Sequence, residues 1–209
     1  REDPEDVVRY LENWADLIVV RHPELAKIEA LARHSPIPVI NAMTSENHPC
    51  EILSDLYALR KLRSDYRELT YAFVGARGNI LNSWAEAAKV LGLRFLHVCP
   101  DGGELGPDGA NYAHVADLAE ALPLSDVVLT DSLPAGLRNA EYIGKYQITL
   151  AGMRTARPGA LLNPCPPFYR GEEVSRDAVE SRHFVGYGFK KSLALVQQAI
   201  MLLCLDRSA

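Results

Sequence analysis

The sequence lacks several patterns that mark common classes of protein. In a chain of net charge −5, no cluster of lysine and arginine occurs, so the electrostatic footprint of a nucleic-acid-binding protein is missing. The four cysteines are widely spaced and form no C-x-x-C pair, which argues against a zinc site or a disulfide framework and suits a reducing compartment. We also expect no apolar run of membrane-spanning length. These absences favour a cytoplasmic protein that has a small-molecule ligand and no nucleic-acid or membrane partner.

The beginning of the chain lacks a methionine and a signal-peptide pattern. It opens with Arg1, and apolar residues at helical spacing follow within a few positions. We therefore expect that residues of the natural protein precede Arg1. With 209 residues, the chain is long enough to bury a core as one large domain or as two modest ones.

Helix-like and strand-like segments alternate along most of the chain. Helices are expected at 4–14, 23–33, 49–62, from just after a turn at 75–79 to 91, and at 115–121, 146–153 and 190–205. Strands are expected at 17–20, 37–42, 69–75, 93–98, 127–130 and 160–163. This order predicts an α/β fold whose strands pair in parallel and are connected by right-handed crossovers.

A polar segment, 63–68, separates two such series and is the expected domain boundary. We predict one domain over residues 1–66, with the apolar C-terminal helix from about 186 to 209 packing back on it, and a second domain over 67–185. In this interpretation the first domain lacks its N-terminal part.

The segment 38–62 carries polar groups at the junction of a strand and a helix. The apolar strand 38–44 leads directly into a helix whose first turn holds His48, Pro49 and Glu51. A helix N-terminus that follows a parallel strand is a favourable place for a phosphate or a carbonyl oxygen. The ordinary structural alternative is that His48 makes a local hydrogen bond and that Glu51 is a first-turn carboxylate. The apolar stripe expected to bury this helix is Ile52, Leu53, Leu56, Leu59 and Leu62.

Polar residues also follow the other expected strands, and a two-domain α/β protein would bring them around one cleft. These residues are Arg21, His48, Glu51, Asn79, Asp131 and Cys165. Each has an ordinary explanation when taken alone: Cys165 as a buried small side chain, Asp131 as a turn residue, Arg21 as a surface ion-pair partner. The glycine turn that leads to Asn79 lacks the third glycine of a dinucleotide-binding motif.

Six segments in collinear order resemble the aspartate/ornithine carbamoyltransferase family, and most closely its ornithine branch. They are VVRHPE (19–24), PVINAMTSENHPCEILSDL (38–56), FVGARGNILNSWAEAAKVLG (73–92), DVVLTDSLPAG (126–136), KYQIT (145–149) and NPCPPFYRGEEV (163–174). Because these segments span nearly the whole chain, the resemblance is more specific than any single motif. It implies two parallel-sheet α/β domains joined by central helices, one that binds carbamoyl phosphate and one that binds an amino acid.

The resemblance also implies roles for residues of the first domain. Arg21, His48 and Glu51 would hold carbamoyl phosphate, with His48 also acting on the reacting carbonyl, and Lys191 would stand in for a late arginine of the family. An arginine fork suits phosphate, and donors around the carbonyl oxygen stabilise a tetrahedral oxyanion.

In the second domain, the resemblance assigns the amino acid to four residues. Asn79 would bind its carboxylate and Asp131 its α-amino group, while Cys165 and Pro166 would lie beside the reacting amine. Asp131, Cys165 and His48 are thus the expected catalytic residues. No metal ion and no organic cofactor is implied.

The chain also departs from the family at several positions. Glu51 replaces a glutamine and exchanges an amide that can donate for a carboxylate that normally only accepts. An S-M-G loop is replaced by 132–136, Pro164 replaces a histidine, and no S-x-R-T-R phosphate loop occurs in these residues. If Glu51 lies beside a phosphate dianion, we expect it either to be protonated or to be held away by a cation such as Arg60 or a residue from the missing N-terminal segment.

Two functions follow from this comparison. The first is a carbamoyltransferase that acts on carbamoyl phosphate and an amino acid closer to ornithine than to aspartate, as a homotrimer by family analogy. The acceptor character of Asp131 and Cys165 suits a cationic amine, whereas aspartate would need arginines, and Arg138 is the only one near that loop. The alternative is a catalytically impaired homologue that acts as a binding or regulatory protein.

Overall fold

The computed structural model describes residues 2–206, and these form two compact units. Unit 1 contains the residues up to Lys61 together with those from Phe189 onward, and unit 2 contains Leu62–Gly188. Each unit is described by itself.

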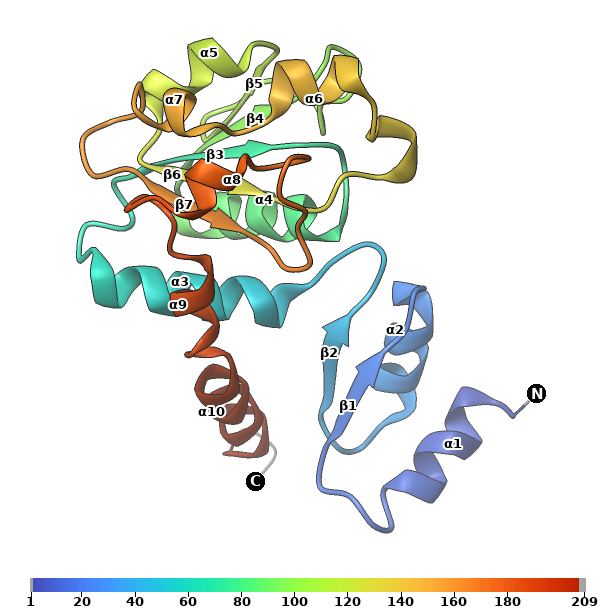
Figure 1. The fold of residues 1–209 in the computed structure, drawn as a ribbon. Coiled ribbons are helices and arrows are strands. Elements are labelled where there is room, and N and C mark those ends of the chain that lie inside the picture. The colour runs from blue at the N-terminus through green and yellow to red at the C-terminus, as the bar shows by residue number, and fades with distance from the viewer. Residues whose placement is uncertain (1, 207–209) are drawn as a thin grey trace. The chain divides into compact units, whose positions relative to one another are not determined.

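Unit 1 is built on two parallel strands, β1 and β2 (Figure 1). Its elements are α1 (Pro4–Leu11), β1 (Ile18–Arg21), α2 (Leu25–His34), β2 (Val39–Met43), α3 (Pro49–Leu62, whose last residue falls in unit 2) and α10 (Leu193–Asp206). Ile18 pairs with Val39 and Arg21 with Met43, so the two strands end at the same edge. The strand–helix–strand order of this unit is the one that its apolar pattern predicts.

The apolar C-terminal segment Gly186–Asp206 reaches a length that the sequence analysis did not expect of any apolar run. It comprises α9 (Gly186–Lys190) and α10, and its 21 residues are long and apolar enough to cross a membrane by length and composition alone. The expectation that no apolar segment reaches this length is therefore wrong. The segment contains two lysines near its start, but its apolar residues keep the mean hydropathy in the range of membrane-spanning helices. Mostly buried core helices of soluble proteins pass the same test, but α10 contains no buried residue; three of its side chains, Gln197, Ile200 and Met201, line a cavity with Ile40 of β2.

The stripe predicted for α3 is correct only in part. Ile52, Leu56 and Leu59 are buried, whereas Leu53 and Leu62 are about half exposed. Asp55, which is not part of the predicted stripe, is also buried and is paired with a lysine that is distant in sequence. Helical spacing alone does not reveal such a pairing.

Unit 2 contains a five-stranded parallel sheet with the strand order β5-β4-β3-β6-β7. Its elements are β3 (Thr70–Val74), α4 (Asn79–Leu91), β4 (Arg94–Val98), β5 (Tyr112–Val115), α5 (Leu118–Ala121), the 3-10 turn η1 (Leu122–Leu124), β6 (Val127–Thr130), η2 (Ala135–Leu137), α6 (Ala140–Tyr146), α7 (Leu150–Met153), β7 (Leu161–Pro164) and α8 (Arg176–Val179). All five residues of the central strand β3 are buried, as expected for a parallel strand that is covered on both faces.

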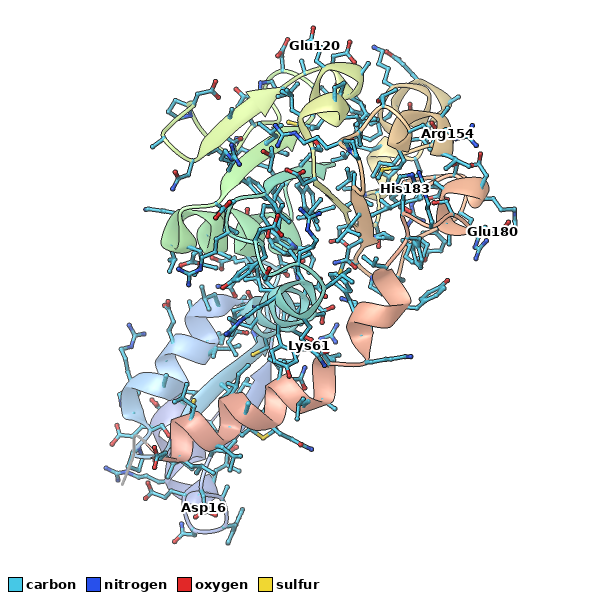
Figure 2. The ribbon with its side chains drawn as sticks, turned by 90° about the vertical axis from the view of Figure 1, so that its left-hand side faces the viewer. Asp16, Lys61, Glu120, Arg154, Glu180 and His183 are labelled. Carbon is cyan, nitrogen blue, oxygen red and sulfur yellow. The ribbon has the colours of Figure 1, made fainter. Side chains whose placement is uncertain are left out.

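Helices cover both faces of this sheet (Figure 1). On one face Tyr71 of β3 packs against Trp84 of α4, with ring centroids 5.6 Å apart. On the other face Ala72 and Val74 join a core to which the helices α5 to α8 contribute. Figure 2 shows His183 inside unit 2, where its Nδ1 lies 2.8 Å from the Ala160 carbonyl oxygen, while Glu120 and Arg154 lie at the outer surface.

The parallel α/β class predicted from the sequence is confirmed, while three local predictions are wrong. The sequence patterns predict no strand at the position of β5, and the helix predicted at 115–121 begins only at Leu118. Of the helix predicted at 146–153, only the second half is present, as α7; residues 147–149 are not helical, and Tyr146 is the last residue of α6. β5 is a four-residue edge strand after a glycine-rich loop, and so short a segment carries little periodicity.

Burial of His97 makes the stability of unit 2 sensitive to pH. The ring is fully buried; its Nε2 donates to the Gly75 carbonyl oxygen at 2.9 Å, and its Nδ1 lies 3.2 Å from the Tyr112 hydroxyl. Desolvation by burial lowers the pKa of His97 below its ordinary value of 6.5, and the hydrogen bond to Gly75 opposes this only in part. The folded state therefore binds fewer protons than the unfolded state just below that pH.

From this linkage we expect unit 2 to lose stability as the pH falls below about 6.5. In His97→Gln, the midpoint of thermal unfolding should be lower at pH 7 but should depend less on pH between about 6.5 and 5. Calorimetric melting curves of both proteins over this range provide the measurement. Equal slopes for the two proteins would contradict the assignment to His97.

Candidate functional site

The carboxyl ends of three neighbouring strands of unit 2 lie in register. Val74 at the end of β3 pairs with Thr130 at the end of β6, and Thr130 pairs with Pro164 at the end of β7. The Thr130 hydroxyl donates to the Val74 carbonyl oxygen at 2.7 Å, and the Cys165 amide donates to the Thr130 carbonyl oxygen at 2.8 Å. The residues that follow these strands are thus brought to one edge of the sheet.

The strand order places a topological switch point between β3 and β6. The chain proceeds from β3 outward to β4 and β5, and then returns to β6 and β7 on the other side. In open α/β sheets, ligands bind outside the carboxyl ends of the strands at such a point. Asp131 directly follows β6, and Asn79 begins α4 after the turn that leaves β3, so both predicted residues flank the switch point.

Glycine at position 75 allows the turn between β3 and α4. Its φ is +147°, a backbone conformation that residues with a Cβ rarely adopt. Its amide donates to the Val98 carbonyl oxygen at 3.0 Å, while its own carbonyl accepts from His97. Three hydrogen-bonded residues therefore fix the start of the turn that delivers Asn79.

Local contacts fix the loops that carry Asp131 and Cys165. The Asp131 Oδ1 accepts from the Ser132 amide at 2.8 Å, and the Ser132 hydroxyl donates to the Pro167 carbonyl oxygen. Cys165 is buried, whereas Pro166 is exposed. The structure thus brings Asp131, Cys165 and Pro166 to neighbouring strand ends, as the sequence order predicts.

In unit 1, the end of β1 meets the end of β2. Arg21 is exposed and pairs in register with Met43, and the next amide, that of His22, donates to the Met43 carbonyl oxygen at 3.1 Å. A compact turn then leads from β2 to α3, because the Thr44 hydroxyl oxygen accepts from the amides of Glu46 and Asn47 at 3.0 and 2.9 Å. This turn places His48 directly before the first residue of α3.

Glu51 is paired with a lysine that the sequence analysis did not connect to it. The ammonium of Lys190 donates to Glu51 Oε1, and it also donates to Asp55 Oδ1 at 2.8 Å. Both carboxylates lie on α3, one helical turn apart, and both are buried. A cation does hold Glu51, but the suggestion of Arg60 is wrong, since the cation is Lys190.

Lys191, the residue expected to bind phosphate, is exposed, whereas the Lys190 side chain is only 19% exposed. Lys190 follows Phe189 at the end of α9, and the turn that follows separates it from α10. The assignment of Lys191 to phosphate stays a prediction. Lys190 joins the candidate site through its contact with Glu51.

Electrostatic interactions connect five charged or titratable groups of unit 1. Desolvation by burial lowers the pKa of His48, Glu51 opposes this shift, and Arg21 and Lys190 add to it. His48 is therefore neutral at pH 7 and can donate one ring hydrogen while it accepts at the other nitrogen. Burial also lowers the pKa of Lys190, but the carboxylates of Asp55 and Glu51 outweigh it and hold this pKa above its ordinary value.

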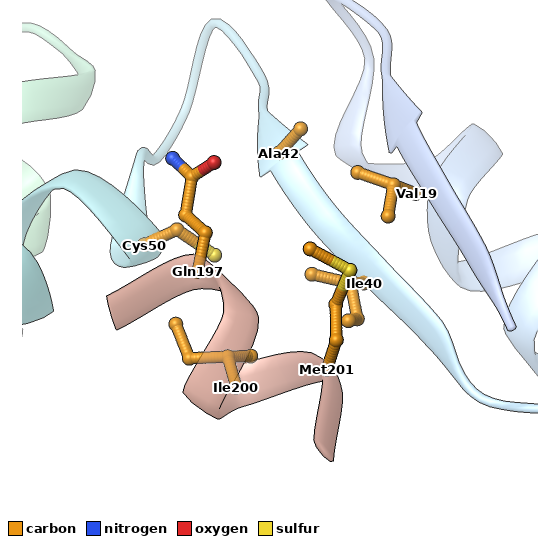
Figure 3. A pocket seen from close by; sticks show the side chains of 7 residues that line it. All are labelled: Val19, Ile40, Ala42, Cys50, Gln197, Ile200 and Met201. Atoms are coloured by element: carbon orange, nitrogen blue, oxygen red, sulfur yellow. The ribbon is translucent and has the colours of Figure 1, made fainter. Parts of the chain in front are cut away.

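Unit 1 also contains a small apolar cavity, which none of these polar groups lines. Figure 3 shows the side chains that line it, and its volume is about 40 Å³. They are Val19, Ile40, Ala42, Cys50, Gln197, Ile200 and Met201. This volume is far below that of a substrate pocket. Burial raises the pKa of the Cys50 thiol and the nearby Cys204 adds to this, so Cys50 is a weak nucleophile.

Among residues 2–206, no group of three or more His, Cys, Asp and Glu side chains is placed to hold a metal ion. The expectation that neither a metal nor a cofactor takes part stays a prediction.

Three structural residues of the site escaped the sequence analysis. They are Thr44, Lys190 and Glu173; the last is 2% exposed and accepts hydrogen bonds from the loops of Asp131 and Cys165. Threonine hydroxyls are known to hold turns through hydrogen bonds to the backbone two residues further on, so Thr44 in this polar loop could have been found. Lys190 contacts Asp55, 135 residues away in the sequence, and Glu173 contacts Leu133, 40 residues away. No local sequence pattern predicts such contacts.

Comparison with protein-family models gives two matches that together cover most of the chain. Residues 1–61 match the carbamoyl-phosphate-binding domain of aspartate/ornithine carbamoyltransferases, and residues 67–204 match the aspartate/ornithine-binding domain.

Individual proteins show the same similarity. The chain is 33% identical to an ornithine carbamoyltransferase of Chromobacterium violaceum, over 96% of this chain and 69% of that protein. The crystal structure of ornithine carbamoyltransferase from Burkholderia thailandensis superposes with a TM-score of 0.89 at 30% identity, over 98% of this chain and 70% of that one. The enzyme from Thermus thermophilus gives 0.88 at 30% identity, over 98% and 72%.

Proposed function

Because the chain belongs to the aspartate/ornithine carbamoyltransferase family, we propose that it transfers the carbamoyl group of carbamoyl phosphate to the amine of an amino acid that resembles ornithine. The products are a ureido amino acid and inorganic phosphate. The observation that supports this proposal is the register of β3, β6 and β7, whose carboxyl ends, followed in the chain by Asn79, Asp131 and Cys165, lie at one edge of the unit 2 sheet.

In this proposal, unit 2 binds the amino acid. Asn79 binds the carboxylate of the substrate, Asp131 binds its α-amino group, and Cys165 and Pro166 line the place of the reacting amine. A carboxylate holds an ammonium group by charge-assisted hydrogen bonds, and two fixed contacts limit the directions in which the reacting amine can point.

Unit 1 binds carbamoyl phosphate in the same proposal. Arg21 contacts the phosphate. His48, at the start of α3, donates a hydrogen bond to the carbonyl oxygen of carbamoyl phosphate. The neutral amine attacks the carbonyl carbon, the carbonyl oxygen takes negative charge, and the bond from carbon to the phosphate oxygen then breaks. The amine loses one proton, and the departing phosphate is the final acceptor.

The surroundings of Arg138 support an amine of the ornithine type. This arginine would be the obvious partner for the second carboxylate of aspartate, but its Nε lies 3.2 Å from Glu172 Oε2 and donates to the Leu133 carbonyl oxygen at 3.0 Å. Its guanidinium also lies over the Tyr169 ring, 4.7 Å from the centroid. Its charge is thus already engaged within unit 2.

We expect the protein to carbamoylate ornithine with a kcat/KM at least about tenfold above that for aspartate, since a misplaced carboxylate costs about one charged hydrogen bond. Colorimetric detection of the ureido product with each amino acid is the measurement. Omission of carbamoyl phosphate is the control. Preferential turnover of aspartate would contradict the substrate assignment.

A second candidate function is that of an impaired homologue that binds a ligand without turnover. Glu51 favours it, because a carboxylate replaces an amide beside the proposed phosphate site. Lys190 works against it, since its ammonium supplies a counter-charge to Glu51. Ornithine binding without any ureido product would decide for this candidate.

A further inference from the structure

Glu173 is a buried carboxylate that uses both oxygens on backbone amides of two different loops. Its Oε1 accepts from the Leu133 amide at 2.6 Å, and its Oε2 accepts from the Tyr169 amide at 2.6 Å. The side chain is almost completely buried. A charge is costly to bury unless hydrogen bonds satisfy it, so this geometry needs both amides.

These two loops carry the residues proposed to hold the amine. Leu133 lies two positions after Asp131, and Tyr169 lies four positions after Cys165. Glu173 also lines, with Gly75, Thr130 and others, a cavity of about 10 Å³ at the carboxyl ends of β3 and β6. One side chain therefore links the loops beneath the candidate amino-acid site.

Other contacts tie the same two loops together. Arg138 donates to the Leu133 carbonyl oxygen and lies over the Tyr169 ring. The Ser132 hydroxyl donates to the Pro167 carbonyl oxygen. Of these links, only Glu173 is buried and charged, and only it contacts backbone amides on both sides.

We propose that Glu173 is a positioning residue for the amino-acid substrate, which fixes the spacing between the loop of Asp131 and the loop of Cys165. This proposal rests on the function proposed above. A loop displaced by about 1 Å can cost a large factor in rate, because both contacts to one substrate must be made at once. Glu173 itself does not touch the substrate in this role.

The test is the isosteric variant Glu173→Gln. Its side chain keeps one acceptor oxygen but directs an NH₂ group at the other backbone amide, so one of the two hydrogen bonds is lost. We expect KM for ornithine to rise about tenfold, the equivalent of one hydrogen bond to a charged group, while KM for carbamoyl phosphate changes less than about twofold. Hydrogen exchange at the Leu133 or Tyr169 amide should accelerate by at least about tenfold, with strand amides of β3 unchanged.

Two further variants sharpen the result. Glu141→Gln removes an exposed carboxylate of the same unit and should change neither KM. Glu173→Asp keeps the charge on a shorter side chain and should raise KM for ornithine less than Glu173→Gln does. If the glutamine variant does not fold, the aspartate variant tests the positioning role in its place.

The outcomes separate the two proposals. A wild-type protein that carbamoylates no amino acid would overturn the proposed function, and this inference with it. An active wild type with an unchanged KM for ornithine in both Glu173 variants would overturn the positioning role alone. Equal rises in both KM values would also overturn it, since they would show general loosening of the protein.

Discussion

Lys190→Met is expected to lower the free energy of unfolding by about 3 kcal/mol at pH 7, because it leaves two buried carboxylates without their cation. Glu51 and Asp55 have side chains that are 9% and 2% exposed, and the same ammonium contacts both. Removal of one partner from a buried ionic group costs more than the group contributes as a whole, since the charges left behind remain desolvated.

This loss of stability should depend on pH. In the wild type, the raised pKa of Lys190 means that its contribution is fully present below the ordinary lysine value of 10.5 and is lost only above it. In the variant, the two carboxylates can relieve their repulsion by taking up a proton as the pH falls. The difference in unfolding free energy between wild type and variant should therefore be smaller at pH 5 than at pH 8.

Lys191→Met is the matched control, because the neighbouring lysine is exposed. Urea unfolding of both variants and of Glu51→Gln/Lys190→Met gives the comparison. The double variant removes one of the two stranded carboxylates and should recover part of the loss, with a coupling of about 1–3 kcal/mol. Equal stability of the two lysine variants would show that the contact is not maintained in solution.

The same pair bears on carbamoyl phosphate. With Glu51→Gln alone, Lys190 keeps its charge while one carboxylate is gone, so the phosphate site becomes more positive. Titration calorimetry should then show tighter binding of carbamoyl phosphate than in the wild type, by about fivefold to tenfold. Tight wild-type binding that this substitution leaves unchanged would remove the best support for an impaired homologue.

The fold could be predicted from the sequence because it follows from local patterns. Buried parallel strands such as β3 and β6 appear as continuous apolar runs, and the helices between them show period-3.6 stripes. The carboxyl ends of these strands mark the site edge, which is why the strand pattern alone places Asp131 and Cys165 at one edge. A four-residue edge strand such as β5 carries too few residues for this argument.

The pairing of charges could not be predicted in the same way. Lys190 and Asp55 are 135 residues apart, and Asp55 lies outside the apolar stripe predicted for α3. A buried carboxylate is compatible with the fold only when a distant cation or amide satisfies it, and periodicity contains no information on that partner. The same holds for Glu173, which accepts hydrogen bonds from the amides of Leu133 and Tyr169 in two different loops.

Asp131→Asn is expected to reduce kcat/KM for ornithine about a hundredfold, mainly through KM. The substitution keeps the shape of the side chain and the Oδ1 that accepts from the Ser132 amide at 2.8 Å, so the local turn should survive. It removes the charge that would pair with the α-amino group, and a charge-assisted hydrogen bond of about 3 kcal/mol corresponds to this factor.

Asp117→Asn provides the control for this prediction. Asp117 also accepts from a nearby backbone amide, that of Ala119 at 2.7 Å, but it follows the edge strand β5 instead of flanking the switch point between β3 and β6. Steady-state kinetics should show wild-type values for Asp117→Asn, and calorimetry should show unchanged carbamoyl phosphate binding in both variants. If the two substitutions reduce kcat/KM equally, the position of Asp131 at the switch point has no functional meaning. A loss confined to Asp131→Asn would instead show that the α-ammonium group of the substrate binds at the end of β6.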